Sequence, residues 1–456
     1  MIGLNGSLSI ATEALGAQTA ALEVTNNNIA NANTPGYSRQ IVSLSSAASI
    51  QNGTTVDEGV SYQGFTSVRD AVLDMAINAA TSDQGSLTAQ NTLLTQINSA
   101  FSGTTTGIGA SISTLFSDIS ALSTNPSDSS ARQTVLSDAG ALANMFHQGA
   151  AALSNASSAA NQQVSSAVAQ VNQLSQQIAS LNGQIVSAEA GGGDGGALTD
   201  QRDELTTQLS QLIGVSTTQT NRTPTLTTTN GSPLVIGASS YQLQVTTAPD
   251  GTAHVLDGQG NDITNELSGG TIGGAITAQD NTIPALSQQL DALASQFATA
   301  MNSAQAAGYD LNGNPGAAMF TVPATGSAAA GITVALTSGS QIAASSDGSS
   351  GSSGNVQALL AVQTNNLPSG ASPTNSYATL VGNIGFAGSQ VSAGLTATTS
   401  SLQQLTTQQD SESAVSIDEE TANLIRYQQA YSASARVIST INDIYTTLMN
   451  MSLGDG

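Results

Sequence analysis

Near each end of the chain, apolar residues recur every seven positions. The N-terminal series is Leu8, Leu15, Leu22 and Ile29. The C-terminal series is Ile417, Leu424, Tyr431, Ile438 and Tyr445, with Tyr427, Ile441 and Leu448 at intervening positions. A heptad stripe of this kind is typical of a helix that packs along another helix. Chain ends are normally the least ordered parts of a domain. We therefore predict that the two terminal helices pair with each other and contact other subunits.

Helical spacing also covers much of the first half of the chain. The expected helices are 3–32, 68–101, 108–122, 128–190 and 198–212, and the longest has a heptad seam at Val164, Val171, Ile178 and Ile185. The first helix is expected to end at the turn-forming residues 31–36. Residues 37–67 are predicted to be irregular or weakly β, with glycines as breaks.

The pattern changes after Val215, where Thr- and Val-rich pieces alternate with turn-forming residues such as Asn230-Gly231 and Asp250-Gly251. This alternation indicates β-hairpins. Helical spacing returns with Pro284 at its start, and its apolar positions are Leu286, Leu290, Leu293, Phe297 and Met301. From Val356 the chain is again mostly helical. The simplest arrangement is an α+β fold in which a β-rich segment is inserted into a helical frame.

Composition restricts the possible partners and chemistry. Only 8% of the 456 residues are charged, the formal net charge is −23, and the seven basic residues are all Arg. A chain without Lys and with so few cations lacks the basic patch that nucleic acid or an anionic membrane would need. Absence of Cys excludes disulfides and thiolate chemistry. Because the sequence shows neither a signal-peptide pattern nor a membrane-span pattern, we expect a cytoplasmic protein or one exported without a cleaved signal.

Two glycine-containing motifs invite a functional interpretation that their context does not support. Gly191, Gly193 and Gly196 satisfy GxGxxG, but a dinucleotide site needs a preceding strand and here a long helix precedes it. Residues 310–314 resemble the start of a calcium loop, but the later positions that should carry Gly and Glu carry Pro315 and Thr321. We therefore predict a flexible loop and a polar turn.

No other residues form a convincing catalytic or metal-binding set. His147 and His254 are the only histidines, and neither has a partner at metal-ligand spacing. The acidic run after Ser416 is interpreted as a helix start, because Ser416 and Glu419 fit a capping box. We expect no enzymatic activity, no cofactor and no metal.

Two terminal segments resemble a known family. Residues 25–40, TNNNIANANTPGYSRQ, resemble the N-terminal signature shared by bacterial flagellar rod, hook and hook-associated proteins. Residues 415–438, VSIDEETANLIRYQQAYSASARVI, resemble the matching C-terminal motif. Three internal stretches, at 200–205, 269–276 and 301–320, resemble segments of the hook-associated branch.

This resemblance implies a structural protein of the hook–filament junction, located outside the cell and exported unfolded without a cleaved signal peptide. Its implied partners are identical subunits in a ring, hook protein, a second junction protein or flagellin on the filament side, and a flagellar export chaperone. The implied domains are a coiled-coil assembly domain (1–45 with 414–456), a helical middle domain (46–214 with 356–413) and a β-rich outer domain (215–355).

The candidate assembly residues combine the stripes with the turn after the first helix. They are Leu8, Leu15, Leu22, Ile29, Asn31, Pro35, Gly36, Tyr37, Leu424, Tyr427, Tyr431, Ile438, Ile441, Tyr445 and Leu448. Two alternatives remain open. The first is a hook or distal-rod protein, which shares the terminal motifs. The second is a surface adhesin that uses the same export route and binds through region 216–355.

Overall fold

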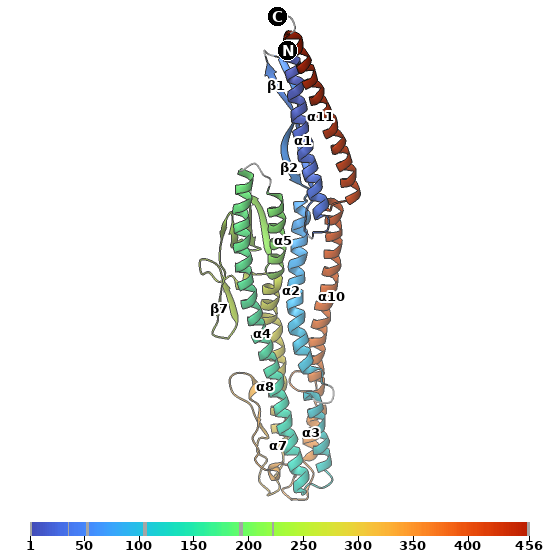
Figure 1. Cartoon of the computed structure of the whole chain (residues 1–456). Coiled ribbons are helices and arrows are strands. Elements are labelled where there is room, and N and C mark those ends of the chain that lie inside the picture. The colour runs from blue at the N-terminus through green and yellow to red at the C-terminus, as the bar shows by residue number, and fades with distance from the viewer. Residues whose placement is uncertain are drawn as a thin grey trace. The chain divides into compact units, whose positions relative to one another are not determined.

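The structure, a computed structural model, describes residues 2–34, 36–51, 54–103, 107–190, 195–220 and 223–453 (Figure 1). The chain forms two compact units. Unit 1 comprises Met1–Ser82, Gln170–Leu243 and Thr399–Gly456, and unit 2 comprises Asp83–Ala169 and Gln244–Thr398. Three of the boundaries between them fall within long helices, and the fourth lies between Leu243 and Gln244, at the start of a short strand.

Helices dominate the fold, and most lie where the apolar spacing predicts them. They are α1 (Ile2–Asn31), α2 (Ala71–Phe101), α3 (Ile108–Leu122), α4 (Ser129–Ala190), α5 (Gly196–Leu212), α6 (Gly270–Thr277), α7 (Ile283–Ala306), α8 (Ala328–Gly331), α9 (Val356–Thr364), α10 (Pro373–Ser413) and α11 (Ile417–Leu453). The helix predicted at 108–122 has those bounds, and the one predicted at 128–190 differs by a single residue. The predicted helix start at Ser416 is also confirmed, since its hydroxyl accepts a hydrogen bond from the Glu419 N–H at 3.4 Å.

The strands pair in small antiparallel sheets, which with the helices confirm the predicted α+β class. They are β1 (Gln40–Gln51), β2 (Thr54–Ser67), β3 (Val215–Thr220), β4 (Thr223–Thr228), β5 (Pro233–Ile236), β6 (Ser239–Ser240), β7 (Gln244–Thr247), β8 (Ala253–Leu256), β9 (Phe320–Thr321) and β10 (Thr333–Val334). Unit 1 holds the four-stranded sheet β3-β4-β5-β6, and unit 2 holds the hairpin β7-β8. Gly231 and Gly251 take positive φ in the predicted hairpin turns, which favours glycine there.

Of the two structures expected at 37–67, irregular or weakly β, the β alternative is confirmed over Gln40–Gln51 and Thr54–Ser67, although the pairing is more extensive than expected. Strands β1 and β2 form one long hairpin whose register runs from Gln40↔Ser67 to Gln51↔Thr54. Two irregularities, after Ser43 and after Ala47, shift the register. A bulge interrupts the strict alternation of apolar and polar residues by which a strand is usually identified. These interruptions explain why the sequence of a long hairpin shows only a weak alternation of apolar and polar residues.

Unit 2 is built on one hydrophobic core. Its α7 contributes all five apolar positions predicted from helical spacing, from Leu286 to Met301, and all five are buried. Phe297 stacks edge-on against Phe116 and Phe320, with ring centroids 6.2 and 5.7 Å away. Such edge-to-face contacts add to the stabilisation from apolar burial. Helix α7 therefore packs with the helical core although it lies in the range 215–355. The three predicted domains do not coincide with the two compact units. The three-domain division therefore stays a prediction.

The polar turn predicted at 310–314 is confirmed. One carboxylate oxygen of Asp310 accepts hydrogen bonds from the N–H groups of Asn312 and Asn314, both at 2.8 Å, and the other accepts from the Asn314 side chain. Gly313 takes φ +76°. The same arrangement recurs at Asp257, which accepts from Gln259, Asn261 and the Asn261 side chain. These carboxylates are therefore occupied in closing their own loops.

Two carboxyl groups interact in unit 2, Asp118 on α3 and Asp138 on α4. Burial first, and then the hydrogen bond and charge of Asp118, raise the pKa of Asp138 from 3.8 to about 6. A raised carboxyl pKa means that the folded chain retains a proton that the unfolded chain releases. The folded state is therefore most favoured below the ordinary pKa, and it loses stability as the pH rises through about 6.

Replacing Asp138 with Asn is expected to raise the thermal unfolding midpoint by roughly 2–4 °C at about pH 7.5 and to leave it nearly unchanged at about pH 3.5. The neutral amide imitates the protonated carboxyl, so the gain appears only where Asp138 is otherwise ionised. Thermal denaturation of the full chain at both pH values measures the effect. Asp83→Asn on the exposed face of α2 changes the net charge equally and serves as the control. An equal gain at both pH values would contradict the assignment.

Candidate assembly surface

The two terminal helices pair antiparallel, so the described ends of α1 and α11 lie at the same end of unit 1 (Figure 1). Near those ends the Tyr445 hydroxyl donates a hydrogen bond to the Asn5 side-chain carbonyl. At the other end, Arg39 lies just beyond α1, and its Nη1 lies 3.0 Å from the Glu419 carboxylate at the start of α11. Two points of contact so far apart along the helices confirm the predicted pairing.

Small side chains occupy the closest contacts of α1. The fully buried apolar positions of the helix are Ala11, Ala17, Ala21 and Val24, while the predicted stripe residues Leu8, Leu15, Leu22 and Ile29 are half-buried. Alanine permits close approach of neighbouring backbones, because it has only a methyl group. The leucines lie beside this buried line, so each keeps part of its surface exposed.

Helix α11 carries more apolar surface than α1 covers. Ile441 is the one large apolar side chain in the described part of this helix that is fully buried, at 5% exposure. Leu424, Tyr427, Ile438 and Tyr445 are half-buried, whereas Tyr431 and Leu448 are exposed. The predicted C-terminal stripe thus divides into residues near α1 and residues that face solvent in the single chain.

The turn after α1 is held by hydrogen bonds within the chain. Asn31 is half-buried, and its amide donates to the Asn27 carbonyl at 3.0 Å. Gly36 is exposed and takes φ +76°, a conformation that favours glycine. The half-buried Tyr37 donates its hydroxyl hydrogen to Asn28 Oδ1 at 2.9 Å. Pro35, the remaining predicted residue of this turn, lies outside the described residues.

Asn28 links the end of α1 to the start of the hairpin. Its side chain is buried and forms a pair of hydrogen bonds with the main chain of Gln40. Nδ2 donates to the Gln40 carbonyl at 2.8 Å, and Oδ1 accepts from the Gln40 N–H at 2.9 Å. Only an amide of this length offers a donor and an acceptor side by side for a strand backbone. Asn28 lies within the terminal signature at 25–40, but it is not among the predicted assembly residues.

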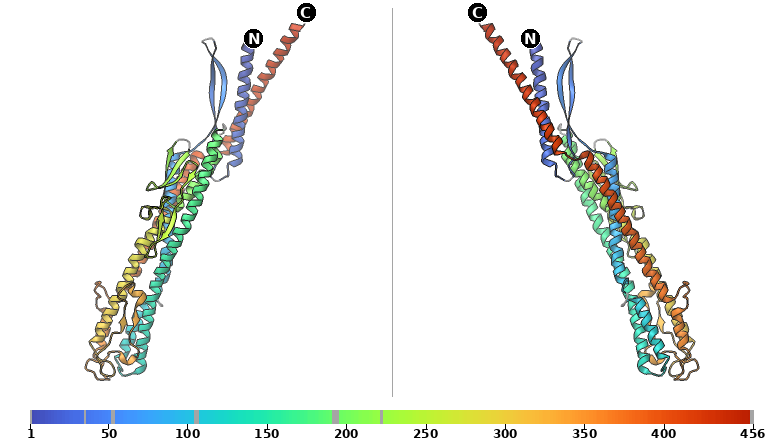
Figure 2. Two further views of the ribbon diagram at one scale, coloured as in Figure 1. Left: turned by 90° about the vertical axis from the view of Figure 1, so that its left-hand side faces the viewer. Right: turned by 90° about the vertical axis from the view of Figure 1, so that its right-hand side faces the viewer.

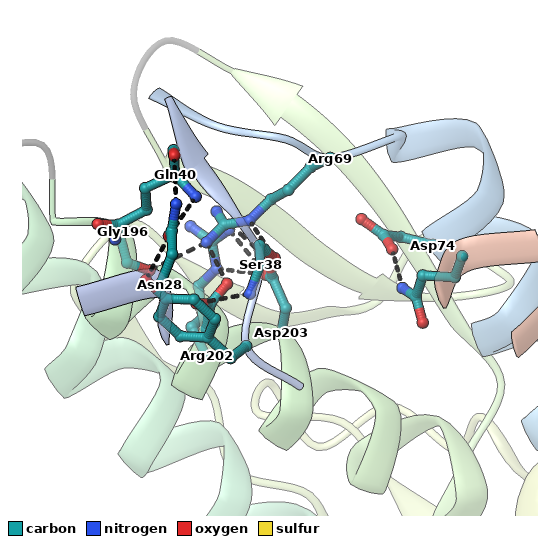
Figure 3. Close-up of polar contacts among 11 residues, drawn as sticks. Asn28, Ser38, Gln40, Arg69, Asp74, Gly196, Arg202 and Asp203 are labelled. Atoms are coloured by element: carbon teal, nitrogen blue, oxygen red, sulfur yellow. Dashed lines mark hydrogen bonds and ion pairs between the residues drawn. The ribbon is translucent and has the colours of Figure 1, made fainter. Parts of the chain in front are cut away.

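Arg69 joins the same turn to α5 (Figure 3). Its guanidinium donates to the Asp200 carboxylate, to the Gly196 carbonyl at 2.9 Å and to the Ser38 hydroxyl at 3.3 Å. The Ser38 N–H donates to the other Asp200 oxygen at 3.2 Å. Since the planar guanidinium presents several donors in fixed directions, one side chain can hold several segments in register.

A second Arg–Asp pair lies beside the first. Arg202 donates from Nε and Nη2 to one oxygen of Asp203 at 2.9 and 2.8 Å, and the other Asp203 oxygen lies 3.8 Å from Arg69. Three of the seven arginines, Arg39, Arg69 and Arg202, therefore lie at or near this turn. We call Ser38, Arg69, Asp200, Arg202 and Asp203 the arginine joint. It concentrates scarce positive charge at one structural connection.

Asp74 on α2 lies close to the joint. Burial first, and next the Asp203 carboxylate, raise the pKa of Asp74 above its ordinary value. Its Oδ1 accepts a hydrogen bond from the Gln409 side chain at 2.8 Å, which acts in the opposite direction (Figure 3). The same group thus attaches the start of α2 to the end of α10.

Metal-ligand clusters and the two histidines can be checked directly in the described residues. Among them no group of three His, Cys, Asp or Glu side chains is arranged to hold a metal ion. His147 shares a hydrogen bond with the Ile332 carbonyl at 2.7 Å, and His254 with Asp262 at 2.6 Å. The Asp262 side chain raises the pKa of His254 above its ordinary value. In this same part of the chain, no helix has both the length and the apolar character to cross a membrane.

Family models match three parts of the chain. A model described as the flagellar hook-associated protein FlgK helical domain matches residues 94–320. The model of the flagella basal body rod protein matches residues 8–37, and that of the flagellar basal body rod FlgEFG protein C-terminal matches residues 408–451. The matched ends contain most of α1 and α11.

Curated relatives align along nearly the whole chain. Flagellar hook-associated protein 1 of Escherichia coli (strain K12) is 28% identical over 546 residues, covering 98% of this chain and 100% of the relative. The protein of the same name from Bacillus subtilis (strain 168) is 27% identical and covers 97% of each chain. Because this chain has 456 residues, the first alignment includes stretches present only in the relative.

A solved structure shows the same fold. The flagellar hook junction protein FlgK from Burkholderia pseudomallei matches with a TM-score of 0.68 at 22% identity, covering 74% of this chain and 100% of that chain. The helical-domain model and the rod-protein models at the two ends agree with the near full-length relatives. The chain is a homologue of flagellar hook-associated protein 1 along nearly its whole length.

Proposed function

We propose that this chain is a structural subunit of the bacterial flagellum that forms the junction between hook and filament. Its subunits form a ring, and they assemble through the paired terminal helices. The observation that carries the proposal is the exposed apolar surface of α11. In one chain α1 covers only part of that helix, and exposed apolar patches on soluble proteins mark interaction sites.

The predicted assembly residues stay part of this proposal. Those of α1 and the half-buried residues of α11 hold the terminal helices together, while Tyr431 and Leu448 are exposed for contacts between subunits. The arginine joint and the Asn28 contact fix the position of the turn at 31–39 beside them. The turn is thus shaped within one chain before a neighbour meets it.

The remaining parts of the proposal follow from the family. We propose hook protein as the partner on one side, a second junction protein or flagellin on the other, and an export chaperone before assembly. The chain would act outside the cell, without enzymatic activity, after export without a cleaved signal. The division into 1–45 with 414–456, 46–214 with 356–413, and 215–355 would describe the order of domains from the axis outward.

The hook-associated helical-domain match distinguishes this proposal from the rod or hook alternative. The two rod models match only the ends of the chain, which axial proteins share. The model that spans residues 94–320 is specific to hook-associated protein.

Deletion of the gene from its host tests the function. Cells without the chain are expected to complete their hooks, to lack attached filaments and to release flagellin into the medium. Electron microscopy of the cell surface and immunoblots of the medium measure this outcome, and the wild-type gene on a plasmid is expected to restore filaments. Deletion cells that still carry normal filaments would overturn the proposal, and so would cells that lack hooks.

A further inference from the structure

The β1–β2 hairpin carries an exposed apolar face. Leu44 and Tyr62 are register partners, and Val60 lies two residues from Tyr62 and so projects from the same side of the strand. Their exposures are 41%, 42% and 36%. We call these three residues the hairpin face. Large apolar side chains gathered on one side of a two-stranded sheet are uncommon in a part of a protein that faces only water.

Helix α11 carries a second exposed apolar face. Val437, Ile444, Leu448 and Met451 are 41–68% exposed. Their spacing of seven, four and three residues places them along one side of the helix, on a stripe that also contains the buried Ile441, so they form the part of that stripe that α1 leaves exposed. We call them the α11 outer face. No charged residue belongs to either face, although the chain has a net charge of −23.

Helix α1 lies between the two elements that carry these faces. It packs against β1 and β2 on one side and against α11 on the other (Figure 2). Hairpin, α1 and α11 therefore form three layers within unit 1, and the intervening helix keeps the outer layers apart. The two faces cannot cover each other within one chain.

We propose that the hairpin face of one subunit packs on the α11 outer face of the next copy of this chain. The inference rests on the proposed function and names the surfaces that would join its subunits. Two different surfaces of one chain make a head-to-tail contact, which closes into a ring or continues as a helix. Each copy carries both a hairpin face and an α11 outer face. The contact therefore joins two different surfaces of identical subunits, which makes it heterologous.

Charge favours a second copy as the occupant. Copies of a strongly acidic chain repel each other, so their contact is best made where neither surface carries charge. Both faces meet that condition. A basic partner would instead be expected to bind an acidic surface, and neither face offers one.

Cysteine cross-linking tests the contact, and the absence of native Cys makes the result specific. The double variant Val60→Cys/Ile444→Cys is expected to give a ladder of oligomers when flagella isolated from complemented cells are oxidised. Each single variant is expected to remain monomeric, because the contact joins different residues. The matched pair Val60→Cys/Asn442→Cys places the second thiol on another side of α11 and is expected to give no ladder.

Three outcomes of the cross-linking would overturn the contact. They are an incorporated double variant that stays monomeric, a single variant that forms dimers, and an adduct with a different protein. In each case the complemented cells still show whether filaments form at the junction. Failure of the contact is therefore distinguishable from failure of the proposed function.

A charge-pair experiment covers the case in which the Cys variant does not assemble. Leu44→Arg and Ile444→Asp are each expected to reduce swimming at least tenfold, and the two together are expected to recover more than half of it. Opposite charges introduced across a real contact compensate each other. A double variant as defective as the worse single variant would contradict the contact.

Discussion

Replacing Ile441 with Asp is expected to abolish incorporation of the chain into the flagellum and to leave the cells non-motile. Ile441 is 5% exposed and lies on the side of α11 that packs against α1. Placing a carboxylate there removes apolar burial and leaves a charge without a partner, which together cost about 3 kcal/mol or more. A pair of helices joined mainly by small and half-buried side chains has little else to offset that cost. Swimming in soft agar and counts of attached filaments measure the loss.

The adjacent Asn442 supplies the control for this variant. Asn442 is exposed, so Asn442→Asp adds the same charge to the same turn without entering the contact with α1. Cells with Asn442→Asp are expected to swim normally. If Ile441→Asp cells also swam normally, pairing of the terminal helices would not be required for assembly.

Replacing Arg132 with Ala is expected to lower the free energy of unfolding by about 3 kcal/mol or more. Arg132 is the largest fully buried side chain, at 1% exposure in unit 2. Its Nε donates to the Pro126 carbonyl, and its Nη1 donates to the Ile342 carbonyl at 2.7 Å and to the Gly339 carbonyl at 3.4 Å. Alanine removes the guanidinium donors and opens a cavity, although the Ile342 and Gly339 carbonyls keep the N–H groups of Ala344 and Ile342 as donors. Thermal and denaturant unfolding of the full chain measure the change.

Burial lowers the pKa of Arg132, the direction expected where a cation is removed from water. The carbonyl acceptors offset part of that desolvation. Arg132→Lys is therefore expected to recover only part of the stability, since an ammonium cannot reach the same acceptors in the same directions. Gln133→Ala at the neighbouring exposed position is expected to change stability by less than about 0.5 kcal/mol. If Arg132→Ala and Gln133→Ala lowered the free energy of unfolding by similar amounts, the buried guanidinium would make no specific contribution to stability.

Apolar periodicity predicts long helices well where the stripe is enclosed. Val164, Val171, Ile178 and Ile185 of α4 are all at most 1% exposed, and that helix was predicted to within one residue. The stripe of α1 is equally regular, but its leucines are only half-buried. Periodicity therefore identifies the helix and its apolar side, and it does not say how much of that side a single chain covers.

Polar residues that connect distant segments could not be predicted in this way. Asn28 and Gln40 are twelve positions apart, and Arg69 and Asp200 are 131 apart, so no local pattern relates them. The sequence offers one indication of a specific role, which is that arginine is rare. With only seven cations in 456 residues, each Arg is a candidate for a specific contact. Arg132 carries the same signal, but its neighbours Ser130, Gln133 and Thr134 are polar, so the local pattern does not predict its burial.

The placement of the arginines also determines where the folded chain is open to digestion. Proteases of tryptic specificity cleave after Lys or Arg, and this chain has no Lys. Arg132 and Arg202 are buried, and Arg39 and Arg69 are partly buried in ion pairs. Among the described residues, Arg426 and Arg436 are the exposed ones, and both lie on α11. Within the described residues, this arrangement makes α11 the main tryptic target, and subunits that pack around α11 would remove that target.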